Sequence, residues 1–262
     1  RAATRRKPKR RPPRRPLPTP RRWPMSRKWG KVEAPWWTDR PVLVVGTGPS
    51  LKRFDFDQLR GLGYILAVKE SVWDLPFADA CFGLDMGWMG RKREALSKLT
   101  MPLYLAVPKD CNEPAIENAI YLIRTRDQQI MHTKPTHIES GGNSGYGGVN
   151  VAFLKRARMI VLFGYDYGGA HYCGDRYTHL EAGHNARYLP RWGKHFDRCK
   201  QQLARAGVSV LNASPRSSVD AFERCTIEKA LEHLYRVRSE GSCSLRGMPV
   251  LDKTAPLGAL AD

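Results

Sequence analysis

The fold of this chain is decided by residues 41–51, which read Pro-Val-Leu-Val-Val-Gly-Thr-Gly-Pro-Ser-Leu. An apolar run of strand length breaks into a glycine-punctuated turn, and Pro49 and Ser50 stand where a helix can begin. In open α/β sheets, a strand that ends in such a turn presents backbone N–H groups to a phosphate. The stretch therefore predicts an α/β fold that handles a nucleotide.

The turn has two interpretations. Leu51 stands where a Rossmann G-x-G-x-x-G motif has its third glycine or alanine, and no G-K-[ST] of a Walker A loop follows. One interpretation is a backbone-and-hydroxyl cradle for a phosphate or ribose. The other is a tight strand-to-helix turn in which glycine is needed only for its conformational freedom. The candidate nucleotide-binding residues of this turn are Gly46, Thr47, Gly48, Pro49 and Ser50.

Composition limits the class of protein. The 262 residues are 42% hydrophobic, which is enough for one substantial core. No apolar run reaches the roughly eighteen residues of a membrane span and none resembles a signal peptide, so we expect a cytoplasmic protein. The six cysteines include no C-x-x-C pair, so we expect reduced thiols and no disulfide framework.

The positive charge is concentrated at one end. Residues 1–32 hold fourteen Lys or Arg and no acid, so this segment carries +14 of the net +19. It is also rich in proline and poor in apolar residues, which predicts a disordered arm. The arm is either a polyelectrolyte that binds nucleic acid or a solvated extension. A third interpretation is that Met25 is the initiator and residues 1–24 lie upstream of it.

Short apolar runs alternate with helical patterns along the rest of the chain, which predicts a mostly parallel sheet flanked by helices. One α/β domain is expected over residues 40–235, with a tail over 236–262. The expected strands are 41–45, 64–68, 80–84, 102–107, 159–163 and 208–211. The expected helices are 91–99, 144–154, 191–206 and 218–235, and a short helix or turn is expected over 51–59.

A second glycine-rich segment covers residues 139–148, with five glycines in its last eight residues, just before a predicted helix. Glycines remove side chains where a ligand can approach, and a helix start carries a partial positive charge. The alternative is a loop whose glycines permit close packing of helix on sheet. The candidate nucleotide-binding residues here are Ser140, Gly141, Gly142, Asn143 and Ser144.

Three histidines follow the strand predicted at 159–163: His171, His179 and His184, with Asp166 near them. They could supply a general base with its orienting partners, because histidine titrates near neutral pH. A metal site and a polar surface loop are the alternatives. No established zinc spacing is matched, so no metal is expected.

Asn212 and Ser214 follow the strand predicted at 208–211. The carboxyl ends of parallel strands converge at one edge of a sheet, so these side chains could line the same crevice. Capping of the next helix would explain the segment equally well.

Four motifs in order carry a family resemblance: Val-Val-Gly-Thr-Gly-Pro-Ser-Leu (44–51), Ser-Gly-Gly-Asn-Ser-Gly-Tyr-Gly (140–147), Ile-Val-Leu-Phe-Gly-Tyr-Asp-Tyr (160–167) and Val-Leu-Asn-Ala-Ser-Pro (210–215). Together they resemble the sialyltransferase-like superfamily. This superfamily includes bacterial family-42 sialyltransferases, the glycosyltransferase domain of motility accessory factors, 6-hydroxymethylpterin diphosphokinases, and uncharacterised proteins of tailed bacteriophages. The resemblance covers residues 40–235 and implies a single Rossmann-like domain.

The resemblance also implies a function: transfer of a sugar from a nucleotide-activated donor to a hydroxyl, without a cofactor. It makes His184 the general base and places Asp166 and Tyr167 in the catalytic group. Hydroxyls of Tyr165, Tyr167 and Tyr172 would stabilise the leaving phosphate. Substrate-binding roles are expected for Tyr165, His171, Tyr172 and His179.

The chain departs from the sialyltransferase pattern at two strand ends. Lys69 stands where those enzymes carry the Asn that reads the nucleotide, and Asp85 follows the next strand, so a CMP-linked donor is not assumed. Asp85 is counted with the nucleotide-binding residues. One alternative is ATP-dependent pyrophosphoryl transfer, with Mg²⁺ held by Asp85 and Asp166. Another is a non-catalytic phage protein that binds nucleic acid through residues 1–32.

Overall fold

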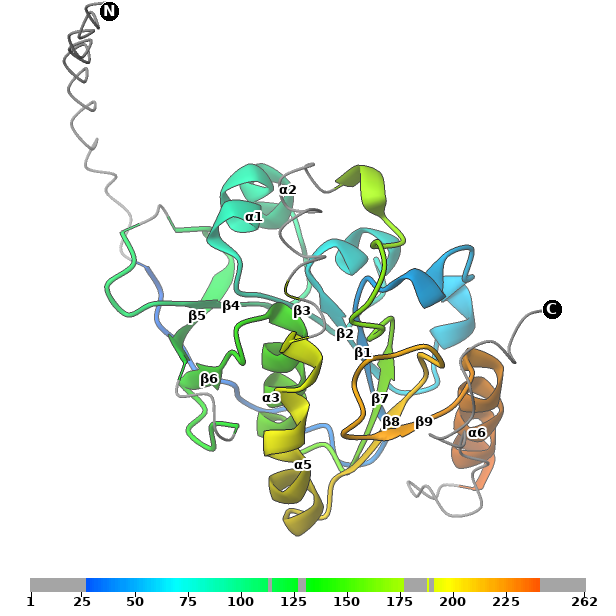
Figure 1. Cartoon of the computed structure of the whole chain (residues 1–262). Helices are drawn as coiled ribbons and strands as arrows, with labels where there is room; N and C mark the ends of the chain where they lie inside the picture. Colours follow the sequence, from blue (N-terminus) through cyan, green and yellow to red (C-terminus); the bar gives the residue numbers. More distant parts are fainter. Residues whose placement is uncertain (1–26, 113–114, 127–130, 177–187, 189–190, 241–262) are drawn as a thin grey trace, which may run out of the picture.

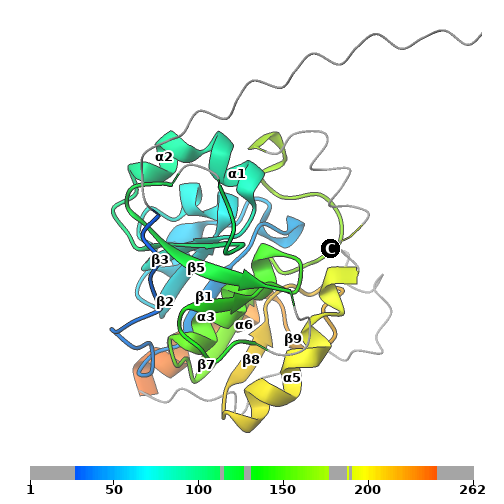
Figure 2. The same cartoon turned by 90° about the vertical axis from the view of Figure 1, so that its left-hand side faces the viewer.

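The computed structural model describes residues 27–112, 115–126, 131–176, 188 and 191–240. These residues form a single α/β domain, in which a nine-stranded, all-parallel sheet is flanked by helices (Figures 1 and 2). The Rossmann-like fold class predicted from the sequence is confirmed. None of the described helices is both long enough and apolar enough to cross a membrane.

The strand order is β6-β5-β4-β3-β2-β1-β7-β8-β9. The chain therefore starts in the middle of the sheet, builds outward to β6, and returns to the other side of β1 as β7. The strands are β1 (Val42–Val45), β2 (Tyr64–Val68), β3 (Ala80–Gly83), β4 (Leu103–Val107), β5 (Ala119–Thr125), β6 (His137–Glu139), β7 (Met159–Phe163), β8 (Ser209–Asn212) and β9 (Glu223–Arg224). The reversal between β1 and β7 is a topological switch point, where open α/β sheets bind their ligands.

Both faces of the sheet are buried, which explains why its central strands are continuous apolar runs. In β1, Val42 and Val44 contribute to one core layer, and Leu43 and Val45 to the other. Helices α3 (Ser144–Leu154) and α5 (Phe196–Arg205) cover the first layer. The second layer is covered by α1 (Met86–Arg91), α2 (Arg93–Ser97), α6 (Ile227–Glu240) and the 3₁₀ turns η1 (Pro49–Leu51), η2 (Phe56–Leu59) and η3 (Lys69–Asp74).

Helix α3 lies unusually close to the sheet because of its glycines. A Cβ atom on Gly147 would come within 2.6 Å of the Phe82 ring, and one on Gly148 within 2.9 Å of Val68. Real Cβ atoms do not make contacts that short, so a larger residue would push the helix off β2 and β3. Close helix–sheet packing thus accounts for these two glycines of the 139–148 segment.

The six predicted strands are present, together with three that were not predicted. Strand β5 was missed although Ala-Ile-Tyr-Leu-Ile-Arg-Thr has the β-branched and aromatic content of a strand. Strands β6 and β9 have three and two residues, which is too short to leave a periodic pattern.

Three helix predictions need correction. The helix expected from residue 218 begins at Ile227 instead, because the Ser218 amide bonds to Asp166 O and β9 intervenes. It continues to Glu240, so residues 236–240 belong to a helix. The helix expected over 191–206 is interrupted by a turn at 194–195 and resumes as α5. In place of the single helix expected over 91–99, the chain forms two short helices, α1 from residue 86 and α2 from residue 93.

The end of the predicted basic arm is attached to the domain. The Gly30 amide donates to Tyr121 O at 3.0 Å, and Val32 is 1% exposed within the core. The folded part thus begins before residue 32, while residues 1–26 lie outside the described part. Five cysteines are free thiols (Cys81, Cys111, Cys173, Cys199 and Cys225), as expected, and Cys243 lies outside the described residues.

At the switch point, the ends of β1 and β7 approach so closely that glycine is required. A Cβ on Gly48 would lie 1.9 Å from Asp166 Oδ2 and 2.6 Å from the carbonyl oxygen of Gly164. The Gly48 amide donates to that same carbonyl at 2.8 Å. Neither neighbour can move away without breaking a hydrogen bond.

We therefore expect Gly48→Ala to lower the free energy of unfolding by about 2–3 kcal/mol through overpacking. Gly90→Ala is the matched control, because a Cβ on Gly90 in α1 meets nothing within 4 Å. That substitution should leave stability unchanged or raise it by up to about 1 kcal/mol. Urea denaturation of both variants measures the difference, and equal stabilities would contradict the requirement for glycine at position 48.

Candidate functional site

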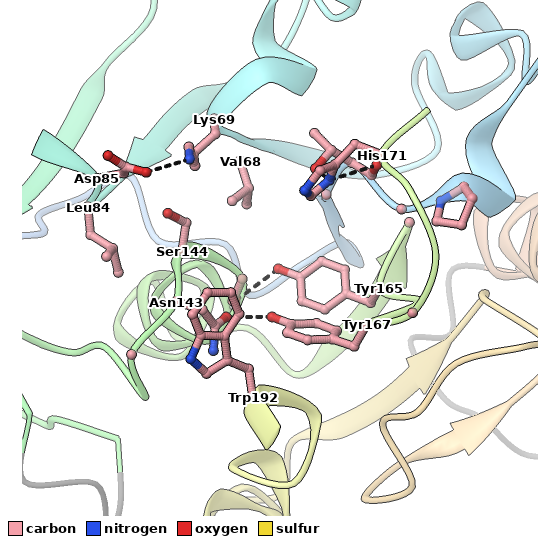
Figure 3. Close-up of a pocket in the computed structure, with 18 of the residues that line it drawn as sticks. Val68, Lys69, Leu84, Asp85, Asn143, Ser144, Tyr165, Tyr167, His171 and Trp192 are labelled. Atoms are coloured by element: carbon pink, nitrogen blue, oxygen red, sulfur yellow. Dashed lines mark hydrogen bonds and ion pairs between the residues drawn. The ribbon is translucent and has the colours of Figure 1, made fainter. Parts of the chain in front are cut away.

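A cleft of about 430 Å³ opens at the carboxyl ends of the strands, on both sides of the switch point. Figure 3 shows this space lined by side chains from segments far apart in the sequence, with Lys69 and Asp85 at one end and His171 at the other. The predicted site residues that line it are Gly46, Thr47, Gly48, Pro49, Asp85, Gly142, Asn143, Ser144, Tyr165, Tyr167 and His171. Segments up to 125 residues apart in the sequence therefore meet at one place.

The turn after β1 forms one wall, and the amides of both its glycines are engaged by β7 and the loop after it. Gly46 N donates to Phe163 O and Gly48 N to Gly164 O, each at 2.8 Å. These two glycine amides are therefore not open to a phosphate, in contrast to the predicted backbone cradle. Its glycines allow the ends of β1 and β7 to approach one another closely.

The start of helix α3 forms the opposite wall. Asn143 is the N-cap, and its Oδ1 accepts from the amide of Tyr146 at 2.8 Å. Ser144 and Gly145 occupy the first turn and line the cleft. Amides in the first turn of a helix have no acceptor within the helix and carry its partial positive charge, so this wall suits an anion.

Two buried tyrosines brace the α3 wall. The Tyr165 hydroxyl donates to Gly145 O at 2.9 Å, and the Tyr167 hydroxyl donates to Asn143 Oδ1. Burial raises the pKa of both hydroxyls above the ordinary value, so both stay protonated. Their protons are engaged with protein acceptors, which differs from the expected donation to a leaving phosphate.

His171 lies at the far end of the cleft, beside the turn after β1. Its Nδ1 and the Oγ1 of Thr47 are 2.7 Å apart, and both side chains line the cleft. The hydrogen bond fixes the imidazole plane against Thr47. A fixed imidazole at a cleft wall can bind a substrate hydroxyl or phosphate, or exchange a proton.

Asp166, predicted in the catalytic group, lies behind the wall and does not line the cleft. It is 3% exposed, and its Oδ2 accepts from Ser50 Oγ at 2.7 Å and Ser50 N at 3.3 Å. Burial raises the pKa of Asp166 above its ordinary value, and the hydrogen bonds from Ser50 offset only part of this. Asp166 thus connects the β7 loop to the β1 turn.

Lys69 and Asp85 form an ion pair at the ends of β2 and β3, with Lys69 Nζ and Asp85 Oδ2 2.9 Å apart. Lys69 has a left-handed backbone with φ of 56°, which is unusual outside glycine, and its side chain is only 12% exposed. Burial acts to raise the pKa of Asp85, but the Lys69 ammonium and the Trp88 amide outweigh it and lower that pKa. Lys69 was not among the site residues predicted from the sequence.

Three more residues of the cleft were missed. Arg124 and Arg126 come from the end of β5, so recognising that strand would have placed them at this edge of the sheet. Burial and the nearby Arg126 charge lower the pKa of Arg124. Trp192 lines the cleft with its ring, and Tyr188 stacks on it at 5.9 Å between centroids. No spacing in the sequence distinguishes Trp192 from a core residue.

The other predicted residues support the cleft from outside. Ser214 Oγ accepts from the Tyr165 amide at 2.8 Å, and the Asn212 side chain accepts from Ser214 N at 3.1 Å. Ser140 bonds to the Thr125 carbonyl, and Tyr172 donates to Asp74. The residues that do not line the cleft are Ser50, Ser140, Gly141, Asp166, Tyr172, Asn212 and Ser214.

His179 and His184 lie outside the described residues, so the predicted general base is not placed. Within the described part of the chain, no group of three or more His, Cys, Asp or Glu residues is arranged to hold a metal ion. Asp85 and Asp166, the pair proposed for Mg²⁺, are engaged with Lys69 and Ser50 respectively.

No protein-family model and no curated protein sequence matches the chain. Among solved structures, the MAf glycosyltransferase from Magnetospirillum magneticum AMB-1 is similar, with a TM-score of 0.46 and 14% sequence identity. The alignment covers 82% of this chain and 39% of that one. The chain thus spans about two fifths of the length of that glycosyltransferase.

The ion pair predicts a shift of the Asp85 pKa. Lys69→Met removes the ammonium and leaves the burial, so the Asp85 pKa should rise. A carboxylate with a lowered pKa stabilises the fold above its unfolded pKa, and that stabilisation is lost as pH falls through the folded pKa. The stability difference between wild type and variant should therefore be largest near neutral pH and shrink in acid.

Carboxyl-carbon NMR titration of Asp85 measures the shift directly. Lys98→Met is the control, because Lys98 pairs with exposed Glu94 and its own side chain is 71% exposed. An Asp85 pKa that stays the same in the Lys69 variant would contradict the coupling.

Proposed function

We propose that the chain is a glycosyltransferase, which moves a sugar from a nucleotide-activated donor to a hydroxyl acceptor. The observation that carries the proposal is the cleft at the switch point, where the start of α3, three cations and the Trp192 ring surround one space. Cations and a helix start suit phosphate, and an indole ring suits a base or sugar ring. In addition, three of the four motifs that resemble the sialyltransferase-like superfamily border this cleft.

The proposed reaction needs a base for the acceptor hydroxyl and positive charge beside the leaving phosphate. A histidine takes the proton of the acceptor hydroxyl, the hydroxyl oxygen forms a bond to the anomeric carbon, and the bond from that carbon to the phosphate oxygen breaks. The leaving nucleotide keeps the bonding electrons, so its negative charge grows and nearby cations stabilise it. His184 is the base that the family resemblance implies, and His171 is the histidine on the described cleft wall.

Pyrophosphoryl transfer from ATP is less well supported. That chemistry would use Asp85 and Asp166 as ligands of Mg²⁺. Asp85 is paired with Lys69, and Asp166 is buried and accepts a hydrogen bond from Ser50. The wall that faces a ligand is cationic instead.

Calorimetry of the full chain with CMP, UDP and ATP, with and without Mg²⁺, tests the proposal. We expect CMP or UDP to bind without added metal. Binding of ATP only with Mg²⁺ would favour the pyrophosphokinase. If no nucleotide binds and salt-sensitive DNA binding is lost on deleting residues 1–24, a nucleic-acid-binding protein is favoured.

The two histidines should differ in effect. Release of nucleotide from a panel of CMP- and UDP-sugars, with water as acceptor, measures turnover. His184→Ala should abolish release and keep donor affinity, whereas His171→Ala should weaken affinity and largely keep the rate at saturating donor. Unchanged release in the His184 variant would remove that residue from the mechanism.

A further inference from the structure

Among the charged side chains that line the cleft, cations outnumber carboxylates. Among the described residues of its wall, Lys69, Arg124 and Arg126 are cationic, and Asp85 is the one carboxylate. The walls therefore carry a net charge of two positive units, before the partial positive charge at the start of α3 is counted. A ligand that fills this space replaces the water that screens these charges, so it must supply matching negative charge.

The cations are gathered at one end rather than spread around the cleft. Lys69 Nζ contacts Asp85, and Arg124 donates to the carbonyl of Leu84, the residue before Asp85, at 3.1 Å. Arg126 is close enough to Arg124 to help lower its pKa. Two guanidinium groups that repel one another gain when an anion lies between them, and planar guanidinium groups suit phosphate oxygens.

The tyrosine hydroxyls that the family resemblance assigns to the leaving phosphate are engaged with other groups of the protein. The hydroxyls of Tyr165 and Tyr167 donate to groups on α3, and that of Tyr172 donates to Asp74 outside the cleft. The negative charge that develops on the leaving phosphate thus falls to the basic end of the cleft.

We infer that the donor is a nucleoside diphosphate sugar rather than a sugar linked to a nucleotide by a single phosphate. This inference rests on the proposed function and specifies its donor. A single phosphodiester brings one negative charge and leaves the walls one positive charge in excess, whereas a diphosphate linkage brings two. A space of about 430 Å³ also falls within the usual range of small-molecule sites.

In the reaction, the bond from the anomeric carbon to the oxygen of the β-phosphate breaks, and that oxygen keeps the electron pair. The acceptor oxygen forms the new bond, and its proton passes to the base. The nucleoside diphosphate therefore leaves with one more negative charge than it had in the donor. Lys69, Arg124 and Arg126 lie where they stabilise this added charge.

The experiment compares matched pairs, CMP with CDP, UMP with UDP, AMP with ADP and GMP with GDP, by calorimetry on the full chain without added metal. For the nucleoside that binds best, the diphosphate should bind about tenfold more tightly than the monophosphate. Arg126→Gln should reduce that ratio about threefold to fivefold, since Arg126 is exposed and its loss spares the fold. Lys98→Gln removes one surface charge from an exposed pair and should leave the ratio unchanged.

Each other outcome overturns a distinct statement. Equal affinity for mono- and diphosphates overturns this inference and leaves the proposed function standing. A diphosphate preference that persists in Arg126→Gln and in Lys69→Gln overturns the assignment to these cations. Failure of every nucleotide to bind overturns the proposed function itself, and this inference with it.

Discussion

The close contact between the ends of β1 and β7 is the constraint on which the rest of the site depends. Gly48 lies against the carbonyl of Gly164, and the Ser50 hydroxyl bonds to Asp166 behind it. Because these strands belong to the two halves of the sheet, their contact fixes where the switch point opens. The cleft is the space left beyond this contact.

The contact also decides which chemical groups the cleft can offer. It takes the amides of Gly46 and Gly48 and the carboxylate of Asp166 out of reach of a ligand. The buried hydroxyls of Tyr165 and Tyr167 are also engaged with protein acceptors, since a buried polar group without a partner costs free energy. Several groups that look reactive in the sequence therefore serve the architecture, whereas three cations, His171 and the first turn of α3 line the cleft.

The glycines show how one residue type serves two purposes. Gly147 and Gly148 let α3 lie on β2 and β3, which sets the height of the helix start above the sheet. Gly142 has a φ of 79° and lines the cleft just before that start, where a side chain would meet Trp192. Within one segment, two glycines thus allow close packing of the helix, and a third keeps the cleft wall free of a side chain.

The sequence by itself determined the α/β class, six of the strands, and two of the glycine-rich walls, because strands buried on both faces are continuous apolar runs and strand ends share one edge. It could not determine which polar groups face a ligand. Ser50 and Asp166 are 116 residues apart, and Thr47 and His171 are 124 residues apart. Such pairings, and the arrival of Arg124 and Arg126 from the unrecognised strand β5, follow from the three-dimensional arrangement of strand ends. Tertiary structure alone decided that the cleft is cationic, since only folding determines which charges are neutralised by a partner and which remain at the wall.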